Sequence, residues 1–433
     1  MFNKSFPMFF YADLHLHSKY SRATSRDLDL EHLSLWAQKK GILLVGTGDC
    51  LHPLWLKELE EKLIPAEEGL FQLKVPLCAQ IQKELPELCR SEVRFMLTVE
   101  VSNIYKKGNK VRKIHNVIFL PSFEAAKKLQ KNLSRSCNLN ADGRPIMGLS
   151  AKDLLREVLE TDPFSFLVPA HIWTPWFSVL GSKSGFDSIE ECFEDLTGEI
   201  FALETGLSSD PSMNWRVGAL DSFVLISNSD AHSPRNLGRE ATIFDTELNY
   251  KSIYYALKDN KKNQGLKGTI EFFPDEGKYF YDGNRQYELR LHPKETCDFL
   301  QKKVAARPIT IGVLNRVEQL ADQPEGRCAP RSRPFYRLVP LTEIIGHIES
   351  VGSQSKKVIR IYEWLLSMLG PELTILRERS MEEIRAVAGD SLAEAITRMR
   401  EGKLIILPGY DGVFGQINIF SQKELESCIG IKT

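Results

Sequence analysis

The stretch Tyr11-Ala12-Asp13-Leu14-His15-Leu16-His17 places one carboxylate and two imidazoles at the end of a predicted strand, and it is the starting point for predicting the fold and a metal site. Phe9 and Phe10 lead into it as an apolar, aromatic run, which predicts a strand entering a core. Side chains two residues apart on a strand point to the same face, so His15 and His17 can grip one metal ion together. An exposed strand end with no ligand role is the alternative, and the motif alone does not decide between them.

The composition is that of an ordinary globular protein. The 433 residues are enough for two or three domains of roughly 150 residues each. Hydrophobic residues make up 42% of the chain and charged residues 26%, which is far from a disordered composition. A formal net charge of −1 gives no global basic field, so any surface for nucleic acid must be local.

Cysteine usage and hydropathy indicate a reducing compartment. The eight cysteines form no C-x-x-C pair, which argues against a zinc ribbon and against a disulfide framework. No apolar run reaches the ~18 residues that a membrane span needs. The N-terminal residues lack the apolar segment and small-residue cleavage site of a signal peptide. We therefore expect a cytoplasmic protein without membrane contact.

Ligand-type residues repeatedly accompany short apolar runs that read as strands. The runs and their residues are 42–47 before Asp49 and His52, 93–99 before Glu100, 114–120 with His115 near its start, 166–170 before His171, 200–203 before Glu204, and 223–227 before Asp230 and His232. Asp49 could instead cap a helix, with His52 in its first turn. Together with the opening run before Asp13 these make seven runs, and their alternation with helical stretches over roughly 245 residues predicts a parallel barrel or sheet. Such folds build their sites at the carboxyl ends of strands.

The remainder of the chain has a different character. Residues 258–265 form a polar connector, and residues 302–337 are locally basic, with Lys302, Lys303, Arg331 and Arg333 among the cations. Aromatic residues interleave there, as in a surface for nucleic-acid phosphates, although a solvated loop has the same composition. From residue 341 onward the pattern is mainly helical. The glycine-rich loop 409–415 lacks a phosphate-loop lysine, which argues against binding of a nucleoside triphosphate.

The ordered set of these residues resembles the polymerase and histidinol phosphatase (PHP) superfamily, and within it the endonuclease Q family. The superfamily pattern is DLHLH (13–17), Asp49, Glu100, His115, His171 and DAH (230–232). The narrower resemblance lies in GTGDCLHP (46–53), PAHIWTPWF (169–177), ETGLSSDP (204–211), RLHPK (290–294) and PGYDGVFG (408–415). These motifs cover the chain from near residue 9 to near residue 420.

The resemblance implies a fold and domain organisation. It implies an α/β protein with a seven-stranded, TIM-like (β/α)7 barrel over residues 1–248. A small middle domain is expected over 249–338, and a mostly helical, DNA-binding domain over 339–433. Archaeal members carry a cysteine-ligated zinc module in the middle segment. Here Tyr287 stands where a cysteine would be expected, and 302–307 replace the C-x-x-C, so we expect no structural zinc.

The resemblance also implies a metal-dependent activity on damaged DNA. Members nick DNA 5′ to deaminated bases (uracil, hypoxanthine or xanthine) and to abasic sites. The expected partners are therefore damaged DNA and replication or repair proteins. Imidazole and carboxylate ligands suit zinc or manganese, and the absence of thiolate allows magnesium. A metal-activated hydroxide would attack the phosphorus in line while a second ion steadies the leaving oxygen.

The implied ligand sets share one carboxylate. The first ion would be held by His15, His17, Glu100 and Asp230, and the second by Glu100, His115 and His171. His232 and Asp49 would support a third, with His52 as a further candidate. Asp230, His232, Glu100 and Asp49 would carry the catalysis.

Recognition of damage requires the abnormal base to leave the stack. Trp173, Trp176 and Phe177 follow His171 directly and are candidates for stacking on that base or wedging the duplex. Packing in a barrel lid is the alternative for these aromatic residues.

Two other functions compete with the endonuclease. A small-molecule phosphatase could use the same metals, but the roughly 190 residues beyond the barrel argue against so compact an activity, by analogy only. A nucleic-acid-binding protein without catalysis is disfavoured because a full ligand set is present.

Overall fold

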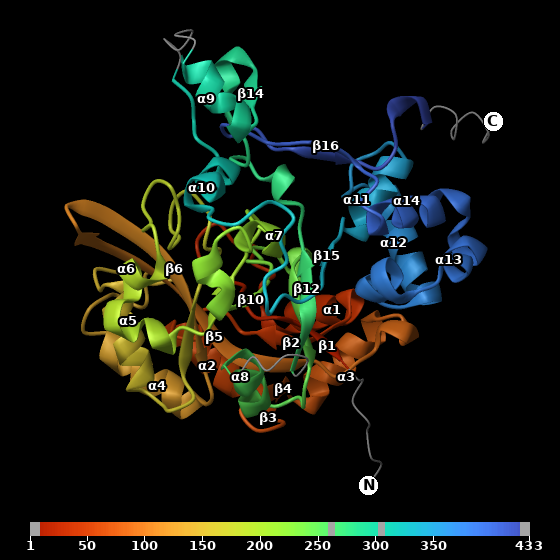
Figure 1. Ribbon diagram of the computed structural model, residues 1–433. Helices are drawn as coiled ribbons and strands as arrows, with labels where there is room; N and C mark the ends of the chain where they lie inside the picture. Colours follow the sequence, from red (N-terminus) through yellow and green to blue (C-terminus); the bar gives the residue numbers. More distant parts are fainter. Residues whose placement is uncertain (1–8, 259–264, 302–307, 425–433) are drawn as a thin grey trace.

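The computed structural model describes residues 9–258, 265–301 and 308–424 (Figure 1). The strands in these ranges are β1 (Phe10–Asp13), β2 (Ile42–Gly46), β3 (Leu63–Pro65), β4 (Phe71–Leu73), β5 (Arg94–Lys107), β6 (Lys110–Leu120), β7 (Ile146–Met147), β8 (Phe166–Pro169), β9 (Ala202–Glu204), β10 (Val224–Ile226), β11 (Ala241–Asp245), β12 (Gly265–Glu271), β13 (Asp282–Asn284), β14 (Leu289–Leu291), β15 (Phe335–Arg337), β16 (Ile405–Leu407) and β17 (Gln416–Asn418).

The helices lie around these strands. They are α1 (Leu30–Lys40), α2 (Pro53–Lys62), α3 (Val75–Glu84), α4 (Phe123–Leu133), α5 (Ala151–Leu159), α6 (Ile189–Phe193), α7 (Pro211–Asn214), α8 (Tyr250–Lys258), α9 (Pro293–Gln301), α10 (Val313–Leu320), α11 (Leu341–Ile348), α12 (Lys356–Leu369), α13 (Met381–Ala388) and α14 (Asp390–Arg400). None of the helices in the described ranges combines the length and apolar character that crossing a bilayer requires.

The main sheet is mixed, and β1 lies in its middle. Its order is β15-β12-β11-β1-β2-β5-β4-β3, with β6 paired to β5 and β8, and β7 paired to β5. β1 is parallel to β2 and antiparallel to β11. All four residues of β1 are buried, as expected for a strand covered on both faces. Helix α1 makes the crossover to β2, capped by Asp29 at its start and by Gly41 (φ 86°) at its end, as both residues predict.

The remaining strands lead back toward β1. β8 is followed by the parallel pair β9 and β10, and the Ile172 amide donates to the Glu204 carbonyl at the end of β9 (3.0 Å). After β10, an isolated parallel bridge joins Ala231 to Leu16, just beyond β1. The ends of strands far apart in sequence therefore meet in one region.

The structure corrects the expectation of a wholly parallel arrangement. β5 and β6 form one long antiparallel hairpin, and β8 is antiparallel to β6. Gly108 (φ 57°) and Asn109 (φ 59°) make the turn, and two consecutive positive φ angles are the mark of a tight two-residue hairpin. Glu100 consequently lies within a strand instead of at its carboxyl end, and His115 lies in the middle of β6 instead of near the start of a strand.

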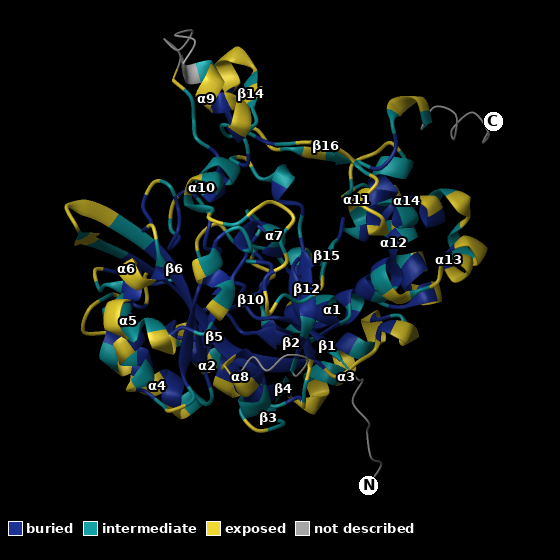
Figure 2. Ribbon diagram, viewed as in Figure 1, coloured by how far each residue is buried: buried dark blue, intermediate teal, exposed yellow. Residues whose placement is uncertain are grey.

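Some segments beyond residue 248 add strands to the main sheet, and others lie outside it. β12 and β15 add two strands to the sheet. The β13–β14 hairpin and α9 project at the top of the view, and β16 leads from there to the helices α11–α14 on the right (Figure 1). The C-terminal region is mostly helical, as predicted, and packs around buried residues such as Ile344, Tyr362 and Ile396 (Figure 2).

A buried aspartate organises the projecting segment. Asp282 accepts hydrogen bonds from the Thr296 hydroxyl (2.5 Å), the Asn315 amide (2.6 Å) and the Gly312 backbone N–H (2.7 Å). These contacts join β13, α9 and α10. Cys297 and Cys328, the cysteines of this segment, are both exposed.

Candidate metal centre

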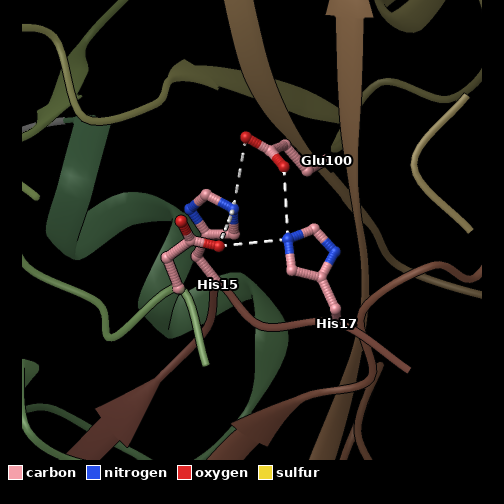
Figure 3. A group of neighbouring side chains, drawn as sticks. His15, His17 and Glu100 are labelled. Atoms are coloured by element: carbon pink, nitrogen blue, oxygen red, sulfur yellow. Dashed lines mark hydrogen bonds and ion pairs between the residues drawn. The ribbon is translucent and has the colours of Figure 1, made fainter. Parts of the chain in front are cut away.

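Four side chains from three distant parts of the chain meet at the end of β1. His15, His17, Glu100 and Asp230 each offer a ligand atom, and these atoms lie within 4.8 Å of one another. His17 Nε2 is 3.0 Å from Asp230 Oδ1 and 3.3 Å from Glu100 Oε2. Figure 3 shows both imidazoles and the Glu100 carboxylate turned toward one another. This is the set that the resemblance implies for the first ion.

A second group adjoins the first and shares Glu100 with it. Glu100, His115 and His171 also offer atoms within 4.8 Å of one another. Glu100 Oε1 is 2.6 Å from His115 Nδ1 and 3.2 Å from His171 Nε2. Glu100 and His115 face the same side because cross-strand neighbours in the β5–β6 hairpin, Glu100–Val117 and Ser102–His115, share a face. In the described ranges these are the groups of ligand-type residues close enough to hold a metal.

Glu204 holds His15 from behind, a role that the sequence interpretation did not assign. His15 Nδ1 donates to both carboxylate oxygens of Glu204, at 2.9 and 3.0 Å. Glu204 is fully buried at the end of β9 and also accepts from the Asn228 amide and the His171 backbone N–H. A carboxylate behind an imidazole fixes its tautomer and leaves the other ring nitrogen for an ion. The available signal was its place directly after a strand, as for Asp49.

Asp49 stands behind His17 in the same way. Its Oδ1 is 3.3 Å from His17 Nδ1, and its Oδ2 accepts from the Ser18 amide, the Ser18 hydroxyl and the Ser21 hydroxyl at 2.7–2.8 Å. Its oxygens are therefore committed to orienting the 15–21 segment. This geometry favours a positioning role over direct ligation of a third ion.

The two remaining candidate histidines, His232 and His52, lie outside both groups. His232 donates from Nδ1 to the Asp230 carbonyl (2.8 Å), and its ring is 4.6 Å from that of His17. His52 precedes α2, and its ring stacks on Tyr20 at 4.6 Å. Neither histidine belongs to the groups of three or more close ligand atoms among the described residues, and support of a third ion by His232, Asp49 and His52 stays a prediction.

Strong electrostatic coupling marks the centre. Burial alone would lower the pKa of His15, but the carboxylates of Glu204 and Glu100 outweigh it and raise that pKa well above its usual range. Burial would raise the pKa of Glu100, yet the imidazoles of His115 and His15 hold it well below its usual range. Burial lowers the pKa of His115 to about 4, against the opposing charge of Glu100. Protons and cations compete for the same nitrogens here, so cation binding would release protons.

Strained backbone concentrates at the same place. Asp49, His171, Phe177 and Asp230 all have positive φ angles, of 49°, 30°, 62° and 48°. Non-glycine residues adopt this region rarely, and such strain persists where surrounding structure enforces it. A Cβ on Gly206 would lie 2.3 Å from the Cβ of His171, so only glycine permits this approach of the loop after β9.

The residues present fit a metal site. His15 Nε2 is buried and has no hydrogen-bond partner, although it lies 3.6 Å from Glu100 Oε1 and 3.7 Å from Asp230 Oδ1. An unsatisfied buried nitrogen aimed at two carboxylates is costly unless something binds there. The imidazole and carboxylate donors match the ligand preferences of zinc and manganese.

One cation was also missed by the sequence interpretation. Arg144 donates to Glu100 Oε2 (3.1 Å), and 27% of its side chain is exposed. It arrives from the loop before β7, where Gly143 lies so close to Asp49 that a Cβ would meet Asp49 Oδ2 at 2.2 Å. Nothing in the local sequence relates this arginine to Glu100, since the contact depends on loop placement.

The three aromatic candidates after His171 have different surroundings. Trp173 is fully buried and donates to Asn214 Oδ1 (2.8 Å), which corrects the expectation that it could stack on a base. Trp176 is 40% exposed and meets the Tyr279 ring edge-on at 5.6 Å. It lines a cavity of about 230 Å³ together with Lys278 and other residues. The Phe177 ring lies 4.6 Å from that of His115.

Of the four basic candidates, the structure describes Arg331 and Arg333, which line a cavity away from the centre. Lys302 and Lys303 lie outside the described residues. Arg331 and Arg333 line a small cavity of about 30 Å³ beside β10 and β12. Arg333 donates to the carbonyl of Leu266 at the start of β12 (3.1 Å), whereas the opposite end of β12 carries Glu271, bonded to Thr205 next to Glu204.

Comparisons with known proteins agree with this arrangement. A family model described as the MJ0043 C-terminal domain matches residues 340–403. Protein MJ0043 of Methanocaldococcus jannaschii is 32% identical over 264 residues, a match that spans 58% of this chain but only 32% of that protein's length. Protein YqxK of Bacillus subtilis is 28% identical over 428 residues, spanning 94% of this chain and 98% of that protein.

Two solved structures match almost the whole chain. A structure of endonuclease Q in complex with a 27-mer duplex carrying an abasic lesion is 30% identical, with a TM-score of 0.79 over 96% of this chain and 98% of that one. The lesion-specific endonuclease PfuEndoQ from Pyrococcus furiosus is 30% identical, with a TM-score of 0.80 over 97% of this chain and 99% of its own. Since identity and fold agree over both full lengths, this chain belongs to the endonuclease Q family.

Proposed function

We propose that this protein is a DNA repair endonuclease that hydrolyses the phosphodiester 5′ to deaminated bases (uracil, hypoxanthine or xanthine) or abasic sites. The observation that carries the proposal is the pair of adjoining ligand groups that share Glu100. Support comes from the similarity to a lesion-specific endonuclease and to endonuclease Q bound to a duplex with an abasic lesion.

The two groups divide the roles among the residues. His15, His17, Glu100 and Asp230 would hold one divalent cation, and Glu100, His115 and His171 a second. Zinc, manganese and magnesium are the candidates. Bound there, such cations supply Lewis acidity that activates water as a nucleophile and offsets charge on the phosphodiester.

Other residues of the chain prepare the reaction. Glu204 and Asp49 hold the His15 and His17 rings in the orientation that turns their Nε2 atoms inward. Arg144 is partly exposed beside Glu100, so its guanidinium can pair with a non-bridging phosphate oxygen. Asp230 has 26% of its side chain exposed, and it therefore lies where substrate would enter.

The damaged base would be held by the loop after β8. The Phe177 ring lies 4.6 Å from that of His115, and Trp176 opens onto the cavity of about 230 Å³ that it shares with Lys278. Stacking on an aromatic ring stabilises an unstacked base by about 1–3 kcal/mol, which offsets the few kcal/mol needed to extrude it. Residues 249–338 and 339–433, as middle and C-terminal domains beside the catalytic domain 1–248, would hold the flanking duplex.

A cleavage panel tests the proposal. The full chain, with Mn²⁺, Zn²⁺ or Mg²⁺ in turn, is offered end-labelled duplexes that carry uracil, hypoxanthine, xanthine, an abasic site or no lesion. We expect a single nick on the 5′ side of the lesion and none in undamaged duplex. Absence of lesion-dependent nicking, with rapid hydrolysis of small phosphate esters, would instead make the protein a phosphatase.

Variants assign the activity to the centre. Asp230→Asn and His171→Gln should each lower the nicking rate by at least about 100-fold, since even residues behind metal ligands change activity by 10–100-fold. His32→Gln is the matched control, because His32 lies on the exposed side of α1 and pairs with Asp29. Full activity of either centre variant would remove the proposed site.

A further inference from the structure

The tip of the β5–β6 hairpin is strongly basic. Residues 105–113 contain five cations and no acid: Lys106, Lys107, Lys110, Arg112 and Lys113. The hairpin projects at the left edge of the molecule (Figure 1), and its tip is exposed (Figure 2). Its base carries Glu100 and His115 of the metal centre. With a net charge of −1 over the whole chain, such a local group is where attraction for a polyanion can arise.

Strand register divides these cations between the two faces of the hairpin. Directly opposed residues share a face, and faces alternate along each strand. The pairs Glu100–Val117, Ser102–His115, Ile104–Lys113 and Lys106–Val111 alternate with Tyr105–Arg112 and Lys107–Lys110. Lys113 and Lys106 therefore lie on the face that carries the metal ligands, and Lys107, Lys110 and Arg112 on the opposite one.

The opposite face is fixed to the body of the protein. Lys107 pairs with Glu194 (2.5 Å) and donates to the Glu191 carbonyl (2.6 Å). Arg112 donates to the Gly185 carbonyl, and its guanidinium lies 4.0 Å from the centre of the Phe186 ring. These contacts use Lys107 and Arg112 to anchor the hairpin, so the ligand-bearing face is held in a fixed orientation.

Within the described ranges, the two lysines of the ligand-bearing face, Lys106 and Lys113, do not anchor the hairpin through ion pairs. Lys113 Nζ lies 5.3 Å from the centre of the Phe177 ring, which in turn is 4.6 Å from the His115 ring. Lys106 is exposed one pair further out. In the described part of the chain, neither lysine forms an ion pair. His115, Lys113 and the Lys106–Val111 pair follow one another along the face in steps of two residues, about 6.6–6.8 Å each.

We propose that this face, defined by Lys106 and Lys113, is a track for the phosphate backbone of duplex DNA leading away from the metal centre. The inference rests on the proposed function for its choice of DNA as the polyanion. Ammonium groups without acidic partners release counterions when they meet phosphates. The alignment with Glu100 and His115 brings the bound strand to the candidate centre.

Binding measured without cleavage tests the track. Fluorescence anisotropy of a labelled, undamaged duplex gives Kd over a range of salt concentrations for the full chain and for Lys106→Gln/Lys113→Gln. Each lost phosphate contact reduces the slope of log K against log salt by about 0.9, so we expect the slope to fall by about 1.8. Affinity at about 0.1 M salt should fall at least about tenfold, equally for all sequences.

A second double variant controls for charge alone. Lys57→Gln/Lys110→Gln also removes two positive charges, but from exposed positions off the track, one on α2 and one on the opposite face of the hairpin. We expect its salt slope to match that of the unmodified protein. Equal slopes for all three proteins, or equal losses in both variants, would overturn the track.

The test of the track can fail independently of the test of the proposed function. If the unmodified protein nicks lesion-containing duplex but the track variant keeps its salt slope, the track alone fails. The unmodified protein could instead fail to nick any lesion-containing duplex while the track variant, unlike the control variant, shows a smaller salt slope and a lower affinity for DNA. The track would then stand and the proposed activity would fail. The single variants Lys106→Gln and Lys113→Gln should each lose about half of the effect.

Discussion

Two carboxylates behind two imidazoles give the metal centre its order. Glu204 accepts from His15 and Asp49 from His17, on the side of each ring that faces away from the other ligands. Both acids are fully buried. A ring held in this way keeps one tautomer, and the ion meets a preformed nitrogen instead of one that must first be oriented.

Glu204→Gln should weaken metal binding by about 10–100-fold, because the amide orients His15 without the charge that raises its basicity. Competition with a chelator of known affinity measures the change. Glu199→Gln, an exposed position nearby, should leave affinity unchanged. Identical affinities for both variants would show that Glu204 serves packing alone.

The identities of the ligands could be predicted from sequence, but their partners could not. His15 and His17 could be predicted from their spacing of two residues. Glu100, His171 and Asp230 could be predicted because each follows an apolar run that reads as a strand. Whether an acid after such a run offers a ligand or orients an imidazole depends on which nitrogen of the His15 or His17 ring it faces. Glu100 faces Nε2, whereas Glu204 and Asp49 face Nδ1. Trp173 also shows that the direction of a side chain could not be predicted from sequence. His171, two residues earlier, faces the centre, whereas the Trp173 side chain is buried in the core.

Among the secondary-structure elements, the β5–β6 hairpin departs most from the sequence interpretation. Its apolar runs suggested two parallel strands with the ligand Glu100 at a carboxyl end. The turn signal was nevertheless present, since Lys107-Gly108-Asn109-Lys110 contains the two residues that adopt positive φ most readily. Extended strands of 14 and 11 residues exceed the usual length, and hydrophobic pattern alone does not reveal polar strand ends.

The loop after β9 depends on a glycine. Gly206→Ala should destabilise the protein by about 1–2 kcal/mol, because φ is 65° at this position. It should also lower nicking by at least about tenfold, since the new Cβ meets His171. Thermal unfolding and the nicking rate measure the two effects.

A second glycine provides the comparison. Gly198→Ala adds a Cβ with no atom within 4 Å, so it should leave both measurements unchanged. A Gly206→Ala variant as active as the unmodified protein would mean that His171 does not need its present position.

The whole molecule is joined by contacts between the two ends of the chain. The Tyr11 hydroxyl of β1 donates to Glu378 (2.7 Å), and Lys40 of α1 pairs with buried Glu372 (2.7 Å). The segment between α12 and α13 is thereby fixed against β1 and α1, on either side of His15 and His17. The helical character of α11–α14 was predictable from local pattern. The docking of this segment was not, because it rests on pairs of residues more than 300 positions apart.

Burial of an acid pair makes stability depend on pH. Glu240 and Glu271 are fully buried, and burial raises the pKa of both well above the ordinary 4.5, helped by repulsion from Glu271 at Glu240 and from Asp210 at Glu271. Above pH 4.5 an unfolded chain releases these protons while the folded protein retains them. Their contribution is therefore complete below that pH and is lost as pH rises toward the folded-state pKa.

Glu240→Gln should therefore reduce the loss of stability on going from about pH 5 to about pH 8. Urea unfolding at several pH values measures it, and the difference between variant and unmodified protein should grow with pH. Glu382→Gln, exposed on α13, should reproduce the pH dependence of the unmodified protein. A constant difference across the range would mean that Glu240 carries no proton in the folded state.

The position of Glu100 between both ligand groups has a consequence for substitutions at this residue. Its Oε1 lies 2.6 Å from His115 Nδ1 and its Oε2 lies 3.3 Å from His17 Nε2, so both groups depend on the same side chain. A substitution at Glu100 would therefore weaken both groups together, and neither could be disabled on its own through this residue.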